Sequence, residues 1–173
     1  MRPAVNLVSV AEEDFDDFIE RLQAAFTQAA RARFPEFLGN IPPQRDIDEA
    51  LDEPHAEMLS IVYEGNIIGG AVITGGTTHK VLEFFFIDPE RQNLNLGQAA
   101  WQAIEARYPE TKTWELVTAY HEKRNIHFYV NKCGFHIVEY FNKYHEDPDF
   151  TQEGAGDYPG SDDGLFKFVK VMA

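Results

Sequence analysis

The sequence is short of cysteine and of basic residues, and it has no long apolar run. Its 173 residues contain one cysteine, Cys133, which excludes an intramolecular disulfide framework and any zinc site built from several cysteines. Lys and Arg number 15 against 29 Asp and Glu, a net charge of −14, whereas a nucleic-acid-binding surface needs a basic stripe. No apolar run approaches the roughly 20 residues of a membrane span, and the N-terminus lacks a signal-peptide core. We therefore expect a cytoplasmic protein with no nucleic-acid or membrane partner.

What is present fits one globular domain covering residues 1–173. The chain is 44% hydrophobic and 13% aromatic, which is too apolar for a disordered protein. A chain of this length can bury a core without a disulfide or a structural metal. Its acidic balance permits a cationic small-molecule partner without requiring one.

Hydrophobic periodicity predicts strands and helices in a mixed order. Strands are expected at 5–8, 58–63, 67–74, 80–87, 113–119, 135–144 and 165–172. Helices are expected behind a capping box formed by Ser9 and Glu12, after Pro42-Pro43, from about Gly97 to Pro109, and over 125–133. The resulting order, β-α-α-β-β-β-α-β-α-β-β, belongs to an α/β (α+β) protein with a mixed sheet.

The segment with most chemical content is LEFFFIDPERQNLNLGQ, residues 82–98. A buried strand runs into a loop that opens a helix, and the unpaired amides at a helix start can bind a phosphate. Many purely structural turns have the same pattern, so this spacing alone leaves both readings open.

Two motifs resemble those of one known family. Gln92-x-x-Asn95-x-Gly97, before an Ala-rich helix, resembles the coenzyme A pyrophosphate motif Q/R-x-x-G-x-G/A of the GNAT superfamily of N-acyltransferases. About thirty residues later, Asn125–Tyr129 followed by Cys133-Gly134-Phe135 resembles the family's next block. The resemblance implies a mostly antiparallel, seven-stranded twisted sheet flanked by about four helices, with acetyl-CoA as the acyl donor.

The resemblance also implies a set of coenzyme contacts. Backbone amides of the buried strand would hold the pantetheine arm, the loop would hold the pyrophosphate, and a polar residue on the following helix would contact the coenzyme. The residues at these positions are Phe85, Phe86, Ile87, Gln92, Asn93, Leu94, Asn95, Leu96, Gly97, Gln98 and Asn125.

Three positions depart from the family's pattern. Asn95 replaces the middle glycine, but Asn is the non-glycine residue that best tolerates a positive φ. Glu122 stands where the family usually has Asn, with Asn125 one helical turn nearer to Tyr129. The gap from Tyr129 to Gly134 is one residue longer than usual.

For catalysis, Tyr129 matches the family's general acid, which protonates the leaving thiolate; the alternative is an aromatic core residue. Glu83, an acid in an apolar strand, is the candidate base, because burial would raise its pKa. The alternatives for Glu83 are a solvent-facing strand residue or an ion pair with a lysine. His121, Glu122 and water are the rival bases.

The predicted activity is transfer of an acetyl group from acetyl-CoA to a primary amine of a small molecule or peptide. Transfer is expected to be direct, because nothing activates Cys133. The alternative is an acyl-CoA-binding sensor or interaction module of the same fold without useful turnover. No metal is expected, because His and Cys do not recur at ligand spacing. The resemblance also allows a homodimer.

The loop between Lys143 and Gly164 is strongly acidic. It carries Glu146, Asp147, Asp149, Glu153, Asp157, Asp162 and Asp163. In the family the connection before the last strand often borders the acceptor site, so this loop is consistent with a cationic acceptor. A solvated acidic loop is the alternative.

Overall fold

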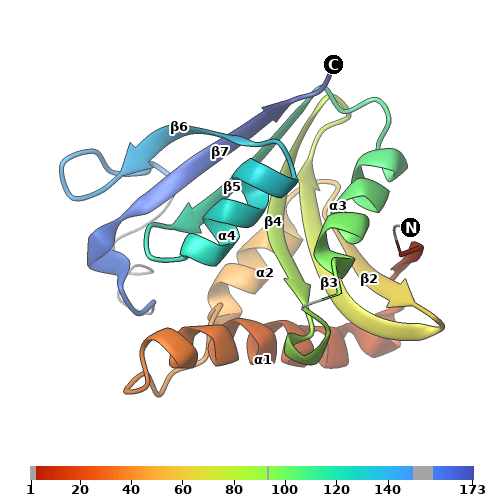
Figure 1. The fold of residues 1–173 in the computed structure, drawn as a ribbon, viewed down its shortest axis with the longest axis horizontal. Coiled ribbons are helices and arrows are strands. Elements are labelled where there is room, and N and C mark those ends of the chain that lie inside the picture. Colours follow the sequence, from red (N-terminus) through yellow and green to blue (C-terminus); the bar gives the residue numbers. More distant parts are fainter. Residues whose placement is uncertain (1–2, 93, 150–157) are drawn as a thin grey trace.

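The computed structural model describes residues 3–92, 94–149 and 158–173. A single seven-stranded, twisted sheet has the order β1-β2-β3-β4-β5-β7-β6 (Figure 1). All neighbouring strands are antiparallel except β4 and β5, which are parallel. The strands are β1 Val5–Ser9, β2 Glu57–Tyr63, β3 Asn66–Gly75, β4 His79–Ile87, β5 Thr113–Ala119, β6 His136–Phe141 and β7 Leu165–Val171. The predicted mixed, mostly antiparallel sheet and its element order are confirmed.

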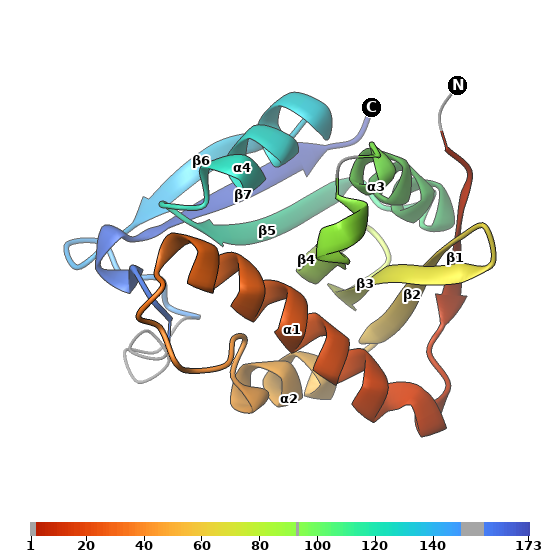
Figure 2. The ribbon, with the colours of Figure 1, turned by 60° about the horizontal axis from the view of Figure 1, so that its bottom comes forward.

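Two helices cover each face of the sheet. On one face, α1 (Phe15–Arg33) and α2 (Gln44–Asp52) bury their apolar stripes against β2, β3 and β4 (Figure 2). On the other face lie α3 (Leu96–Arg107) and α4 (Lys123–His127). Helix α4 continues directly into a π-helical turn, Phe128–Lys132.

The sheet opens in its middle, between β4 and β5. These strands pair only where His79–Val81 meets Thr113–Glu115, although β4 continues to Ile87 and β5 to Ala119. Beyond the paired residues, the edge of β4 that faces β5 and the edge of β5 that faces β4 have no strand to pair with. The two strands therefore diverge around a gap that faces the N-terminus of α3 and the helix α4.

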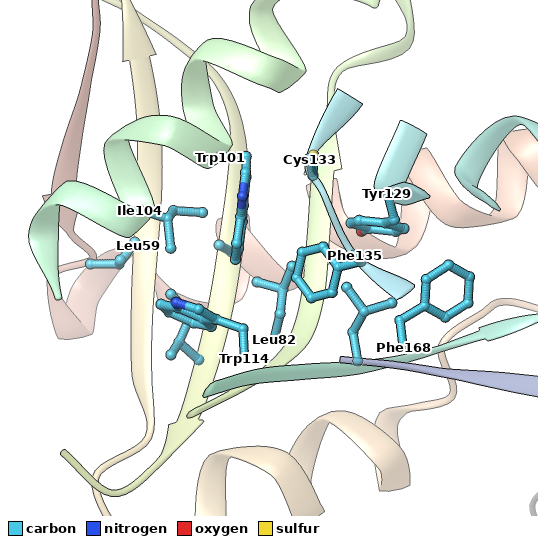
Figure 3. Close-up of a cluster of buried hydrophobic side chains, with 12 residues drawn as sticks. Leu59, Leu82, Trp101, Ile104, Trp114, Tyr129, Cys133, Phe135 and Phe168 are labelled. Atoms are coloured by element: carbon cyan, nitrogen blue, oxygen red, sulfur yellow. The ribbon is translucent and has the colours of Figure 1, made fainter. Parts of the chain in front are cut away.

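The largest core cluster lies on the α3 side and joins the two halves of the sheet. Trp101 of α3 packs edge-on against Trp114 of β5, with 5.0 Å between ring centroids, and its ring is tilted against that of Phe135, at 5.2 Å (Figure 3). The same cluster takes in Leu82 from β4 and Phe168 from β7, both buried. This shared core keeps the sheet continuous on the α3 side although β4 and β5 separate.

The predicted capping box at Ser9 and Glu12 is wrong. Ser9 is the last residue of β1, paired with Leu59, and a 3-10 turn at Glu12–Asp14 precedes α1. Strand pairing extends the backbone at Ser9, and its hydroxyl lies 3.4 Å from the guanidinium of Arg107 instead. Sheet pairing thus overrides a favourable local capping pattern.

Across the part of the chain that the structure describes, no helix combines the length and apolar character needed to cross a membrane.

Candidate active site

A cleft of about 1600 Å³ lies where β4 and β5 diverge. Its walls come from both strands, from the α1–α2 face, from the start of α3, and from α4 with its π turn. Residues of the loops at 142–149 and 158–164 also line it. The volume exceeds the roughly 300–1,000 Å³ typical of a site for one small ligand, so two substrates have room to meet here.

Helix α3 begins at the cleft with amides that have no partner within the helix. Asn95 is its N-cap, with φ 58° and ψ 20°, and its side chain makes no capping hydrogen bond. Asn95 thus has a positive φ, the conformation that Asn tolerates best among non-glycine residues. The N–H groups of Leu96, Gly97 and Gln98 have no partner within the helix, because the first intrahelical bond joins Ala99 N to Asn95 O. Such amides, at the positive end of the helix dipole, favour an anion such as a pyrophosphate.

Side chains of this loop hold its shape and leave the backbone to face the cleft. Gln92 donates to the carbonyl of Ile87 at 3.1 Å, and Gln98 donates to the carbonyl of Lys132 at 3.1 Å. A Cβ on Gly97 would lie 3.2 Å from the ring of Phe128, so glycine permits the close approach of α3 to the π turn.

The remaining loop positions divide into three cases. Leu96, the first residue of α3, is fully buried, and Leu94 is exposed. Asn93 lies outside the described residues. The backbone of Phe85, Phe86 and Ile87 lies along the part of β4 that has no β5 partner.

Helix α4 brings the polar residues of the second motif to the cleft. Glu122 is its N-cap, and the cleft lining includes Glu122, Asn125 and Tyr129. The helix thus begins early enough for these three residues to share a face. The extra residue before Gly134 is absorbed by the π turn, in which Cys133 N bonds to Phe128 O, five residues back.

Tyr129 lines the cleft and also belongs to the core. It is only 8% exposed and its ring packs edge-on against Phe135 and Phe168 (Figure 3). Burial, with a smaller contribution from the neighbouring Cys133, raises the pKa of its phenol far above the ordinary value. The hydroxyl therefore stays protonated at neutral pH, which a general acid requires.

Glu83 occupies a β-bulge on the cleft side of β4. The register skips it, pairing Phe84 with Val72 and Leu82 with Ile73. Its carboxylate is half-buried and accepts a hydrogen bond of 2.7 Å from the hydroxyl of Thr74. Burial raises the pKa of Glu83, and this outweighs the lowering by Thr74.

Three more carboxylates act on Glu83 from other elements. Glu53 follows α2, Glu115 lies on β5 and Asp149 lies in the loop after β6, and their negative charges raise its pKa further. The carboxylate of Glu115 lies 3.0 Å from Nε2 of His79 and forms an ion pair with Lys167 at 3.6 Å. Among the described residues, Glu53, Glu83 and Asp149 form no ion pair. The alternative of a lysine-paired Glu83 is therefore not what the structure shows.

The rival base His121 lines the cleft and contacts the segment that begins at residue 158. Its side chain is only 6% exposed, its Nε2 lies 3.1 Å from the carbonyl oxygen of Pro159, and its ring packs edge-on against Phe34. Glu122 lies 3.5 Å from the other ring nitrogen.

The cleft lining is acidic overall, with eleven Asp and Glu against four Lys and Arg. Glu146, Asp147, Asp149 and Asp162 of the acidic loop belong to it, whereas Glu153 and Asp157 lie outside the described residues. Sequence analysis missed the carboxylates of the α2 segment, Asp46, Glu49 and Glu53, although their i, i+3, i+7 spacing places them on one helix face. It also missed Thr74.

Neither thiol nor metal chemistry has support among the described residues. Cys133 is buried, and burial raises the pKa of its thiol to about 12. Within 3–92, 94–149 and 158–173 no group of three or more His, Cys, Asp or Glu side chains could hold a metal ion.

Comparison with known proteins identifies the family. Residues 17–135 match the model of the acetyltransferase (GNAT) family. The uncharacterized protein YrkN of Bacillus subtilis (strain 168) is 43% identical over 175 residues, covering 98% of this chain and 95% of that protein.

Solved structures share the fold at low identity. A Bacillus subtilis acetyltransferase in complex with CoA superposes with a TM-score of 0.66 at 17% identity, covering 99% of this chain and 100% of that one. A GNAT family acetyltransferase from Elizabethkingia anophelis with acetyl-CoA bound gives 0.66 at 15% identity, covering 97% and 98%. The ribosomal-protein-S18-alanine N-acetyltransferase of Escherichia coli gives 0.69 at 14% identity, covering 98% and 96%. With a family match over most of its length and the open β4–β5 sheet, the chain belongs to the acetyltransferase (GNAT) family.

Proposed function

We propose that this protein is an N-acetyltransferase that moves an acetyl group from acetyl-CoA directly to a primary amine. The observation that carries the proposal is the divergence of β4 from β5, with the first amides of α3 at the resulting cleft and Glu83 inside it. Family membership and the CoA-bound structures of similar fold support the choice of acyl donor.

The described residues fit a coenzyme A ligand. The amides of Leu96, Gly97 and Gln98 have no partner within α3 and are suited to the pyrophosphate. The edge of β4 at Phe85–Ile87 has no β5 partner and suits the amide groups of the pantetheine arm, with the Ile87 carbonyl already bonded to Gln92. Asn125 lines the cleft from α4, and in this proposal it contacts the coenzyme. Acetyl-CoA, when bound, supplies the thioester carbonyl that the amine attacks.

Three groups of this chain serve the reaction in the proposal. Glu83 removes the proton from the incoming ammonium group, since only the free amine is a nucleophile. Backbone amides of β4 stabilise the negative charge that develops on the carbonyl oxygen, a contribution of a few kcal/mol per oriented donor. Tyr129, protonated because it is buried, donates its proton to the departing thiolate. Cys133 takes no part, since its thiol stays protonated.

The acceptor in this proposal is cationic beyond its reacting amine. Glu53 and Asp149 join Glu83 in one cleft, from three separate elements, without a cationic partner among the described residues. A second positive charge on the acceptor, as in a diamine, a polyamine or a lysine-containing peptide, would relieve this repulsion. A monoamine of equal length would not.

Two measurements test the function. Acetyl-CoA at about 100 times its dissociation constant should add roughly 2.7 kcal/mol of stability, a rise in Tm of several degrees, and adenosine diphosphate serves as the control ligand. Transfer of labelled acetyl to diamines, polyamines and matched monoamines should then favour the dications. Glu83→Gln should lower kcat by about 10²-fold or more. Glu20→Gln, an exposed carboxylate of α1 outside the cleft, is the matched control.

The outcomes separate the proposal from its rival. No Tm shift at millimolar acetyl-CoA overturns the donor assignment. A clear shift without transfer to any amine indicates the acyl-CoA-binding module, which the replacements at Asn95 and Glu122 favour. Equal rates with dications and monoamines overturn the cationic acceptor alone.

A further inference from the structure

We infer that Thr74 is a positioning residue that aims the carboxylate of Glu83 into the cleft and favours its ionised form. The inference rests on the proposed role of Glu83 and goes beyond it, since it assigns control of that role to a residue on another strand.

The hydrogen bond between these residues is short and comes from a buried donor. Thr74 is only 3% exposed, and its Oγ1 lies 2.7 Å from Oε1 of Glu83. An ionised carboxylate can only accept, so the threonine hydroxyl donates. A hydrogen bond to a charged acceptor is stronger than one between neutral groups, so it favours the ionised form of Glu83.

Backbone geometry fixes both partners. The bulge leaves Glu83 without a partner in the β3 register, so its side chain and that of Phe84 both point to the α1–α2 side, where Phe84 packs against Phe26. After Thr74 the chain turns at Gly75, with φ 99°, where any Cβ would lie 2.6 Å from the carbonyl oxygen of His79. This tight turn sets where β3 ends and thus where the hydroxyl of Thr74 lies.

Burial and three neighbouring carboxylates oppose the ionisation of Glu83. Burial acts first, followed by the negative charges of Glu53 from the α2 side, Glu115 from β5 and Asp149 from the loop after β6. Among the described residues, Lys167 forms its ion pair with Glu115, and the ring of His79 also contacts Glu115. The Thr74 hydroxyl is the contribution that lowers the pKa of Glu83. Without it the base would be protonated over a wider range of pH.

The test compares donor and non-donor variants in the full-length protein. Thr74→Val and Thr74→Ala remove the hydroxyl, and Thr74→Ser keeps it. Thr111→Val is the control, because Thr111 is equally buried, at 4% exposed, but its hydroxyl donates to the carbonyl of Thr77 away from the cleft. The first readout is the titration of the Glu83 side-chain carboxyl by carbon-13 NMR without ligand, assigned with Glu83→Gln. The second is the acid limb of kcat/KM against pH.

We expect both non-donor variants to raise the pKa of Glu83 by about one pH unit and to move the acid limb upward equally. Thr74→Ser should restore both, and Thr111→Val should leave both unchanged. An unchanged carboxyl titration in a folded non-donor variant overturns the inference, as does failure of Thr74→Ser to restore it. If the titration moves but the acid limb does not, the control by Thr74 stands and Glu83 is not the base. The NMR arm needs no acceptor, so it decides on Thr74 even if the proposed function fails.

Discussion

Replacement of Asn95 tests how the phosphate-binding loop keeps its shape without the usual glycine. Asn95 has φ 58° and ψ 20°, and its side chain makes no capping hydrogen bond. In Asn95→Ala, therefore, the change in stability comes from the backbone alone. Left-handed backbone costs an ordinary L-residue roughly 1–2 kcal/mol, and Asn bears less of that cost. We expect Asn95→Ala to lower the free energy of unfolding by about 1 kcal/mol, or about 2–4 °C in Tm for a chain of this size.

Asn95→Gly completes the comparison. Glycine adopts this conformation freely, so Asn95→Gly should stay within about 0.5 kcal/mol of the wild type. It also removes the N-cap side chain, which would crowd a pyrophosphate bound at the first amides of α3, so the Kd for acetyl-CoA should fall. Asn6→Ala, at an exposed site in strand β1, controls for loss of an asparagine in ordinary extended backbone.

Urea unfolding and isothermal titration with acetyl-CoA supply the two quantities. Equal stability of Asn95→Ala and Asn95→Gly would refute the left-handed conformation as the reason for Asn at this position. Weaker acetyl-CoA binding by Asn95→Gly would show that the asparagine side chain helps to hold the ligand.

Three further predictions concern the acid, the helix contact and the core. Tyr129→Phe should lower kcat about tenfold or more and leave the Kd for acetyl-CoA unchanged, because the ring packing survives; a wild-type kcat would make Tyr129 a core residue only. Gly97→Ala should weaken acetyl-CoA binding measured by titration, because the added Cβ lies 3.2 Å from Phe128 and pushes α3 away from the π turn; wild-type affinity would contradict this. Leu22→Ala, at a fully buried site of α1, should lower the free energy of unfolding by about 2–5 kcal/mol in urea, and a loss below 1 kcal/mol would contradict the packing described.

The sequence predicted those elements whose signals are local. β5 begins and ends as expected at Thr113 and Ala119, and Gly134 ends the helical block with φ 83°. β6 ends at Phe141, earlier than expected, because Asn142 and His145 bond to each other in a tight turn.

Features that depend on strand register could not be predicted. Glu83 was a candidate because an acid stands out in an apolar strand, but the bulge that aims it into the cleft arises from pairing with β3. The same register brings Thr74 to Glu83, nine residues away, and nothing in the local sequence indicates that bond. The π turn could be predicted only in part. The extra residue before Gly134 is evident in the sequence, but the sequence does not show that a π turn accommodates it.

The limited pairing of β4 with β5 has a mechanical consequence. Only three residue pairs join β1–β4 to the strands β5, β7 and β6, so the backbone offers a short hinge between two lobes, supported by the packing of Trp101 and Trp114. A ligand that hydrogen-bonds to the unpaired edges of both strands would connect the two lobes across this hinge while it is bound. Ligand binding should therefore slow amide hydrogen exchange along the edges of β4 and β5 that face each other. Exchange in β2 and β3, which are paired along their length, should change little.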